Sequence, residues 1–373
     1  MQRGRGEKMR PPHPFFELNL RELQMQQTRR WTAGLTMSLF VACRVADTVA
    51  PAGVPAASLP TATLTKVYPA SQYTPTALLS DHGWFTDVND RNLVVGTIWT
   101  YAVAMPLHGA VHPLPPGGSV ESNANAVNTH GAIVGRGNLG TSLAPKWMPA
   151  LWPDMTSTPI FAGIAGEAAD NNDQGLIVGT GTRGTTTFAF VWDGVSAPVR
   201  LPFLPGGRSS YAVAISPDNV ILGASDSPSG STTVLWRQNG SGGWTPKAVS
   251  GGIAGRDIDT AYGIVGSTGS RASFGNPNHA GYFNTGAGEA NAVSPSGVAT
   301  GTDAAGSPGW PTYWVAFVAD RAGNTTHLPD PTGGGLVRAT NGFGINNCGV
   351  VVGSVWVLGG FYTTNPALWD PGC

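Results

Sequence analysis

The chain has 373 residues, of which 52 are Gly and 30 are Pro, and only 12% are charged, compared with roughly 25% in an average soluble protein. Because 41% of the residues are hydrophobic, the composition provides a packed core and excludes a disordered chain. The net charge of -1 excludes the surplus of Lys and Arg that neutralises phosphates, so we expect no nucleic-acid partner. Gly and Pro interrupt helices, and the composition therefore favours short strands joined by turns.

The N-terminus has the pattern of an export signal. The first thirty residues contain seven Arg or Lys and three Glu. Residues 31–42 follow without a charge, which is the length of the apolar part of a signal peptide and too short to span a bilayer. We therefore assign residues 1–42 to a signal peptide. A start at Met25 would give a more compact signal of the same kind.

The segment Phe40-Val41-Ala42-Cys43 resembles the lipobox of bacterial lipoproteins, in which a small residue precedes the Cys that receives lipid. Residues 43–61 are rich in Ala, Pro, Val and Thr, as in an extended tether. We expect lipidation of Cys43 and location as an outer-membrane or periplasmic lipoprotein that contacts the membrane only through its lipid. Cleavage without lipidation, which gives a secreted extracellular protein, and the absence of export are the alternatives.

Seven copies of one unit follow, each with a polar turn and a short aliphatic strand closed by Gly. The Gly residues are 39, 44, 44, 43, 35 and 52 positions apart, about 43 on average, which suits the four short strands of a propeller blade. We predict an all-β, seven-bladed β-propeller over residues 62–373, with an open β-solenoid as the alternative. The repeats end at Gly96, Gly135, Gly179, Gly223, Gly266, Gly301 and Gly353.

Each repeat has a local turn signal, and the two ends of the array match one another. An Asn, Ser or Asp, such as Asn128, stands seven residues before each Gly, where its side chain can bond to the turn. The last unit lacks a fourth strand, whereas residues 64–69 resemble one. We therefore expect this N-terminal strand to complete the last blade, because closure removes the unpaired edges of an open array.

The repeats resemble those of the bacterial HAF-repeat proteins, which are named for a His-Ala-Phe tripeptide in the third strand. The similarity covers roughly residues 85–373. It is carried by Phe188-Ala189-Phe190, by His279-Ala280 and by the Ile-Asn-x-x-Gly-x-Val-Val-Gly pattern of residues 345–353. The resemblance implies an exported, extracellular β-propeller, and it brings no catalytic residues with it.

The chain has three Cys residues, Cys43, Cys348 and Cys373. If Cys43 carries lipid, an even pair remains for the folded domain. In a four-stranded meander, the first turn and the end of the third strand lie at the same end of the sheet. Cys348 is in that turn and Cys373 follows that strand, so we predict a disulfide between them. Two unpaired thiols are the alternative.

Few residues have the spacing of a catalytic or metal site. Asp87, Asp170 and Asp257 occupy equivalent positions on the predicted innermost strands, where carboxylates could surround a central channel. They would serve a carbohydrate-active hydrolase or lyase.

His108 and His112 have the spacing of helical metal ligands, but the Pro and Gly around them prevent a helix. The calcium-loop-like residues 170–175 coincide with a repeat turn. We expect no metal and no cofactor.

Exposed Trp side chains are suited to stacking on ligands such as sugars. The candidate ligand contacts are therefore the Trp residues outside the regular third-strand positions, namely Trp84, Trp99, Trp244 and Trp310. The sequence favours an exported, monomeric and non-catalytic β-propeller that binds a protein or a polysaccharide at the bacterial cell envelope. The carbohydrate-active enzyme is the alternative.

Lipidation can be tested directly. Cells that express the full chain are expected to attach a radiolabelled fatty acid to it, and Cys43→Ala is expected to abolish the label because the lipid is attached through this Cys. An unlabelled parent chain would contradict the lipoprotein assignment.

Overall fold

The computed structural model describes residues 67–260, 263–276, 279–283, 285, 287–305, 313–332, 337–358 and 362–372. All of them belong to the compact unit Thr61–Cys373. The predicted signal peptide, Cys43, the tether, Trp310 and Cys373 lie outside the described residues. Apart from one short 3-10 helix, η2 (Ala70–Gln72), the regular elements described are strands. None of the described segments is a helix long and apolar enough to cross a membrane.

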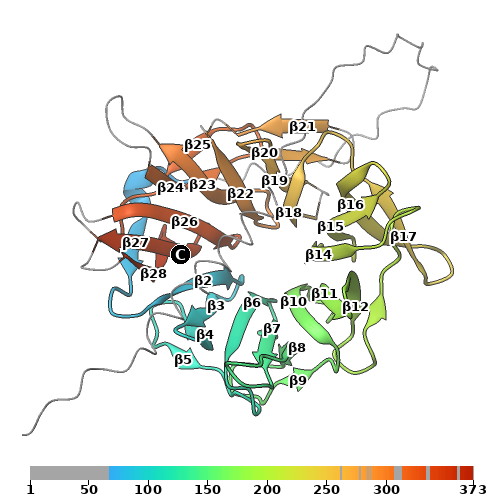
Figure 1. The fold of residues 1–373 in the computed structure, drawn as a ribbon. Coiled ribbons are helices and arrows are strands. Elements are labelled where there is room, and N and C mark those ends of the chain that lie inside the picture. Colours follow the sequence, from blue (N-terminus) through green and yellow to red (C-terminus); the bar gives the residue numbers. More distant parts are fainter. Residues whose placement is uncertain are drawn as a thin grey trace, which may run out of the picture. The chain divides into compact units, whose positions relative to one another are not determined.

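Five four-stranded antiparallel sheets form most of the unit, and each follows the chain order from its innermost strand outwards (Figure 1). The first two are β2 (Gly83–Val88), β3 (Leu93–Ile98), β4 (Tyr101–Pro106), β5 (His112–Pro113), and β6 (Ser122–Val127), β7 (Ile133–Asn138), β8 (Trp147–Trp152), β9 (Ile160–Phe161). The other three are β10 (Ala165–Asn171), β11 (Ile177–Arg183), β12 (Thr186–Trp192), β13 (Val199–Arg200); β14 (Ser210–Ile215), β15 (Ile221–Ser227), β16 (Gly230–Gln238), β17 (Trp244–Ala248); and β18 (Ala254–Ile258), β19 (Ile264–Thr268), β20 (Arg271–Asn276), β21 (His279–Tyr282).

The last two repeats form one eight-stranded mixed sheet. A parallel pairing of Trp314 with Ala339 joins its two antiparallel halves. The pairing is possible because the inner strand of the last repeat has nine residues and reaches the third strand of the repeat before it. The sheet contains β22 (Gly288–Val293), β23 (Ala299–Ala305), β24 (Tyr313–Ala319), β25 (Thr325–His327), β26 (Val337–Ile345), β27 (Val351–Leu358), β28 (Tyr362–Asp370) and β1 (Thr74–Ala77).

The predicted seven-bladed propeller is therefore wrong. The β-propeller arrangement consists of five four-stranded blades and the mixed sheet. The alternative β-solenoid is wrong as well, because β2 of the first sheet packs against β26, β27 and β28, so that the contacts between sheets return to their start.

The N-terminal strand and one outer strand also differ from the sequence prediction. The strand that pairs with β28 is β1, with Ala77 opposite Ala367, and not residues 64–69. The reason is that Tyr73, just before β1, is buried in the core around Trp369, so the chain before it turns across this core. In the fifth sheet His279 begins the outer fourth strand, β21, and not the third.

Each repeat Gly lies inside the second strand of its sheet, opposite a β-bulge in the inner strand. Gly223 pairs with Ala212, beside the register shift between Ala212 and Ala214. A Cβ at Gly223 would lie 2.0 Å from the carbonyl oxygen of Tyr211. The same contact lies between 1.8 and 2.3 Å at all seven repeat glycines. These glycines are therefore required by the close approach of two backbones, and they do not mark strand ends.

The turns between first and second strands bind one another from sheet to sheet. The Asn89 side-chain oxygen accepts hydrogen bonds from the N–H groups of its own turn, and its Nδ2 donates to the carbonyl of Asn128 at 2.8 Å. Asn128 and Asn172 donate in the same way to the next turn, at 3.0 and 3.1 Å. Asn346 of the last repeat donates to the carbonyl of Asn89 at 3.1 Å. This last bond closes the ring across 257 positions of sequence.

Buried Trp side chains at the ends of third strands form a second set of links. Each Nε1–H donates to a Pro carbonyl near the fourth strand of the preceding repeat. The three pairs are Trp152 with Pro115 at 2.9 Å, Trp236 with Pro202 at 2.7 Å and Trp369 with Pro329 at 2.7 Å. Trp192 departs from this pattern and donates to Ser196 of its own sheet.

The turn that contains Cys348 lies beside the C-terminal segment. A Cβ built at Gly349 would lie 3.5 Å from the Pro371 side chain. The partner predicted for Cys348, Cys373, is outside the described residues, so the disulfide stays a prediction.

The role of the repeat glycines predicts a large difference between two Gly→Ala variants. Gly223→Ala is expected to lower the free energy of unfolding by about 1 to 3 kcal/mol, because the methyl group forces two strands apart. Gly240→Ala is the control, since a Cβ there meets no atom within 4 Å, and we expect a change within about 0.5 kcal/mol. Chemical denaturation followed by circular dichroism measures both. Equal effects would contradict the proposed backbone contact.

Candidate functional site

Asp87, Asp170 and Asp257 lie at the bulges of the inner strands β2, β10 and β18. In each, Oδ1 accepts a hydrogen bond from the next residue's N–H, at 2.8, 2.8 and 2.7 Å. Oδ2 accepts from an N–H of the next inner strand along the chain. These donors are Val127 at 2.9 Å, Ile215 at 2.8 Å and Val293 at 2.8 Å. Each carboxylate therefore joins two neighbouring strands.

Burial dominates the electrostatics of these acids. It raises the pKa of Asp87 to about 6 and that of Asp257 to about 7, although the backbone hydrogen bonds oppose the rise. Burial also raises the pKa of Asp170 well above its usual value, and the charges of Asp257 and Asp87 add to that rise. The three acids are thus close enough to repel one another.

Other side chains of the inner strands bind the carbonyl groups of the neighbouring strand. Thr86 donates to the carbonyl of Ala124 at 2.9 Å, Asn125 to that of Ala168 at 2.7 Å, and Asn291 to that of Gly342 at 2.8 Å. Together with the Asp side chains they satisfy backbone groups on the inner edges of the sheets. Because both oxygens of each Asp are engaged in this way, the arrangement favours a structural role for these acids over a catalytic one.

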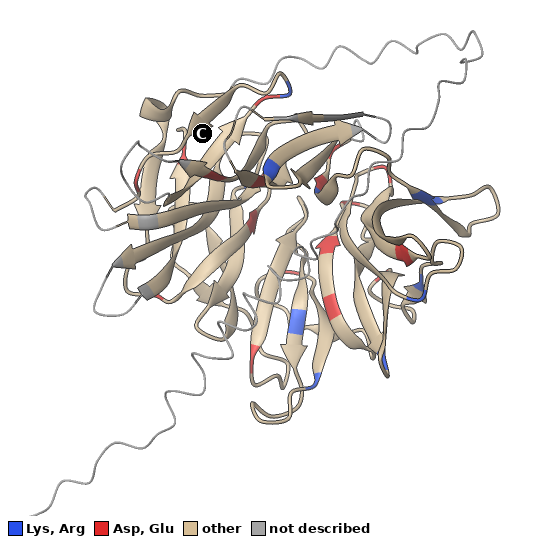
Figure 2. Cartoon of the chain, turned by 45° about the horizontal axis from the view of Figure 1, so that its top comes forward, with Lys and Arg blue, Asp and Glu red and all other residues tan. Residues whose placement is uncertain are grey.

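The remaining sequence candidates are dispersed. The His108 Nε2 lies 2.7 Å from Asp370, whereas His112 is exposed on β5. In the calcium-loop-like segment, Asn172 closes a turn and Asp173 accepts the N–H of Thr129 at 2.8 Å. Among the residues that the structure describes, no three His, Cys, Asp or Glu side chains gather to hold a metal ion. Charged residues are scattered over the sheets in Figure 2, and some of them form ion pairs, such as Arg256 with Glu289.

One sheet departs most from the repeat in the length of its outer hairpin. The fourth strands β5, β9 and β13 have two residues each, β25 has three and β21 has four, whereas β17 has five. Three additional pairs extend the hairpin, from Trp236 opposite Pro246 to Gln238 opposite Trp244. The Asn239 side chain accepts N–H groups of the connecting loop, at 3.2 Å from Ser241 and 2.9 Å from Gly243. This extension brings Trp244 over the neighbouring sheet.

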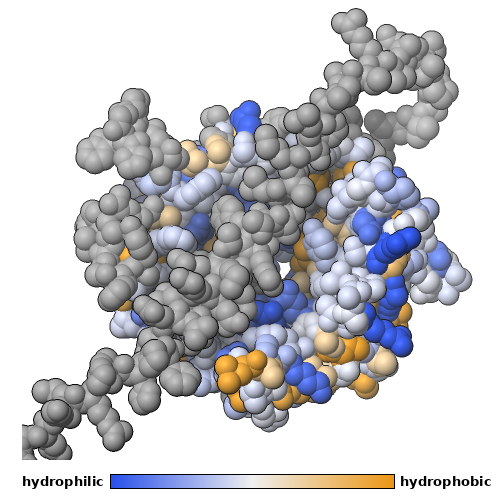
Figure 3. All heavy atoms as spheres, in the orientation of Figure 1, coloured by the Kyte–Doolittle hydropathy of each residue, from blue (hydrophilic) through white to orange (hydrophobic). Residues whose placement is uncertain are grey.

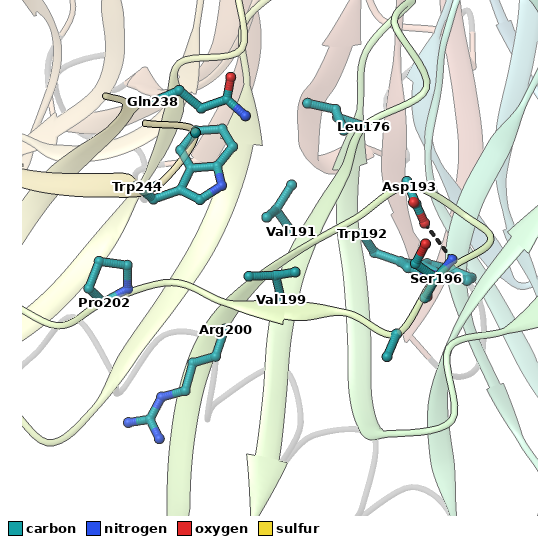
Figure 4. Close-up of a pocket in the computed structure, with 13 residues that line it drawn as sticks. Leu176, Val191, Trp192, Asp193, Ser196, Val199, Arg200, Pro202, Gln238 and Trp244 are labelled. Carbon is teal, nitrogen blue, oxygen red and sulfur yellow. Dashed lines mark hydrogen bonds between the residues drawn. The ribbon is translucent and has the colours of Figure 1, made fainter. Parts of the chain in front are cut away.

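A groove of about 350 Å³ lies between the extended hairpin and that neighbouring sheet. Figure 4 shows Trp244 and Gln238 on one side, Val191 and Val199 between, and the turn of Asp193 and Ser196 on the other side. Val199 is 57% exposed, and Trp244 is half-buried. The Trp192 Nε1–H bonds within its own sheet, so this Trp makes no hydrogen-bonded link between sheets of the kind that Trp152, Trp236 and Trp369 make. We call the groove lined by these side chains, namely Trp244, Gln238, Val191, Val199, Asp193 and Ser196, the Trp244 groove.

The Trp244 groove is lined by a charged carboxylate, a neutral amide and the stem of an Arg side chain. Hydrogen bonds from the N–H groups of Val195 and Ser196 lower the pKa of Asp193, so its carboxylate is charged at neutral pH. The Gln238 side-chain amide makes no hydrogen bond to another described residue. In Figure 4 Arg200 points away from Trp244. Its guanidinium lies 4.1 Å from the ring centre of Phe203.

The sequence identified Trp244 but not the groove. Of the other Trp candidates, Trp84 is half-buried on β2, Trp99 is 59% exposed, and Trp310 lies outside the described residues. On the face seen in Figure 3, hydrophobic side chains gather mainly at the lower rim, where β8, β9 and β12 lie in Figure 1. The one sequence signal for the groove was the Gly- and Ser-rich run of residues 239–243, which lengthens the outer hairpin.

No family model matches the chain, and no curated protein matches it. Twenty chains of solved structures do match. TolB from Acinetobacter baumannii is 10% identical, with 67% of this chain and 63% of that chain covered and a TM-score of 0.41. A protein assigned as TolB from Agrobacterium tumefaciens is 15% identical over 66% of this chain and 80% of its own, with a TM-score of 0.39. A gluconolactonase from Xanthomonas campestris is 13% identical over 80% and 88%, with a TM-score of 0.36.

The buried Asp residues predict an unusual dependence of stability on pH. Their pKa values are higher in the folded than in the unfolded chain, so the folded state binds more protons, and stability increases as the pH falls from 7 to 5. The expected gain is about 1 to 2 kcal/mol for Asp87 and for Asp257.

The comparison of the parent chain with Asp257→Asn isolates one group, because Asn does not titrate and its amide oxygen can still accept one N–H. Chemical denaturation at several pH values should show a smaller gain in the variant. Identical pH profiles would show that Asp257 does not titrate in this range.

Proposed function

We propose that this chain is an exported, non-catalytic binding protein of the bacterial cell envelope that holds a polysaccharide in the Trp244 groove. The observation that carries the proposal is the extended hairpin of β16 and β17. It places an indole and an amide opposite a charged carboxylate, at the one described sheet whose outer hairpin departs most from the repeat.

The chemistry of the groove suits a sugar chain. A pyranose ring has an apolar face of C–H groups and a rim of hydroxyl groups. Trp244 and Val199 offer a flat apolar surface, while Gln238 and Asp193 offer a donor and acceptors for hydroxyl groups.

A binding role is also supported by what the acids do elsewhere. Asp87, Asp170 and Asp257 accept six backbone N–H groups between them, one at each carboxylate oxygen. These hydrogen bonds give the three acids a role in the fold and not in binding a substrate. The other part of the proposal, export, rests on the sequence of residues 1–43 and on the resemblance to the HAF-repeat proteins.

Substitution of Trp244 tests the proposal. The mature chain is expected to bind at least one polysaccharide from a panel of cellulose, chitin, xylan and purified peptidoglycan sacculi. Trp244→Ala is expected to weaken that binding about tenfold, which corresponds to about 1.4 kcal/mol for the stacking of one aromatic ring. Depletion isotherms measure both chains.

The control for this substitution is Tyr211→Ala, since Tyr211 is 47% exposed on β14 and is not part of the groove. We expect this variant to bind like the parent chain. The bound polysaccharide should keep its length, with no new reducing ends. Release of reducing ends would favour the enzyme. Binding that is unchanged in Trp244→Ala would exclude the groove, and recovery of a specific envelope protein without polysaccharide binding would favour a protein ligand.

A further inference from the structure

Trp99 has a backbone conformation that disfavours a bulky residue. It is the first of two residues in the hairpin between β3 and β4, where Ile98 pairs with Tyr101, and its φ is 56°. The equivalent hairpins of β11 and β12 and of β19 and β20 have Gly184 and Gly269 at this position, with φ of 63° and 61°. Glycine adopts this left-handed conformation without steric cost, whereas a bulky side chain does not.

The strained residue is also among the most exposed aromatic groups described. Trp99 is 59% exposed, and Tyr101 on the same hairpin is 51% exposed. The ring contact that Trp99 makes among the described residues is edge-on with His82, and the two ring centres are 4.5 Å apart. The fold therefore gains little packing from Trp99 in return for its backbone strain, and a role in ligand contact accounts for a strained residue better than a structural role does.

The surroundings of Trp99 identify the chemistry of a ligand. Over residues 78–101 the one Lys or Arg is Arg91, which lies in the turn at the opposite end of the strands. Exposed polar groups beside the hairpin are Ser80, His82 and Thr100, and Asp81 is partly exposed. An anionic lipid surface would require cations here. Flat aromatic rings with hydroxyl, imidazole and carboxylate groups instead match a neutral sugar.

We infer that Trp99 and Tyr101 form a second carbohydrate-contact site, separate from the Trp244 groove. The hairpin of Trp99 joins second and third strands, whereas the groove lies at turns that join third and fourth strands. In an antiparallel meander these connections are at opposite ends of the strands. Two sites at opposite ends would allow one chain to bridge two polysaccharide strands. The class of ligand inferred for this second site rests on the proposed function. The position of the site does not, because it is argued from Trp99 itself.

The test uses Trp99→Gly, because Gly removes the indole and relieves the strain together. We expect this variant of the full mature chain to bind the polysaccharide of the panel described above about tenfold more weakly and to melt about 1 to 3 °C higher than the parent. Trp99→Ala is the matched variant. It should lose the same affinity without the gain in melting temperature, since Ala keeps a Cβ in the left-handed conformation.

Bridging provides a second readout. The parent chain should cross-link a soluble form of the polysaccharide, measured as an increase in turbidity or viscosity, and either Trp99→Gly or Trp244→Ala should abolish the increase while leaving residual binding. Loss of binding in Trp244→Ala together with unchanged binding in Trp99→Gly would overturn the second site and leave the proposed function intact.

Three further outcomes test the two sites. Weaker binding in Trp99→Gly with unchanged binding in Trp244→Ala would support the Trp99 site and overturn the groove. A lower melting temperature in Trp99→Gly would show that the indole is structural and would overturn the second site. Failure of the parent chain to bind any polysaccharide of the panel would overturn both proposals.

Discussion

The free inner edge of the sheets is the constraint on which the rest of this structure depends. An innermost strand has a hydrogen-bonded neighbour on one side only, and the N–H and C=O groups on its other side need partners if they are buried. The chain supplies these partners from the same inner strands. Asp87, Asp170 and Asp257 accept the N–H groups, and side chains such as Asn125 donate to the carbonyl groups.

The arrangement of the acids follows from their charge. One Asp serves two neighbouring strands, so the intervening repeats need none, and they have Ala126, Ala214 and Ala292 at the equivalent position. The alternation keeps buried carboxylates apart, although they still repel one another. The last repeat has Gly344 at this position, where a Cβ would lie 2.7 Å from the Cα of Asp87. A further acid at that point would therefore be excluded by space as well as by charge.

The two proposed binding sites lie where the chain departs from these repeated contacts. Trp152, Trp236 and Trp369 link neighbouring repeats, whereas Trp192 bonds within its own sheet beside the Trp244 groove. Trp99 stands where the two equivalent hairpins of β11–β12 and β19–β20 have Gly. A residue that the repeat requires has a structural explanation, so the exceptions are the positions at which a ligand can account for the choice of side chain.

Some features could be predicted from the sequence because they depend on neighbouring residues. The turn at Asn128 was predicted correctly, since its side chain bonds to N–H groups two and four residues later. The repeat glycines were found at the right positions but were interpreted as strand ends, because the bulge that excludes their Cβ lies on another strand. The sequence predicts the closing strand at residues 64–69, whereas β1 begins at Thr74. The difference depends on the burial of Tyr73 against residues near the other end of the chain, such as Trp369.

The sequence by itself determined the all-β class, the repeat, the turn chemistry and the equivalence of the three Asp residues, all of which are local or periodic. Only the tertiary structure decided that the last two repeats share a sheet, through the pairing of Trp314 with Ala339. It also decided that the acids bind backbone N–H groups of the next repeat, and that Trp244 lies over the neighbouring sheet. These features depend on contacts between residues about 25 to 50 positions apart, and the ring itself closes over 257 positions between Asn89 and Asn346. No local propensity specifies such distant pairs.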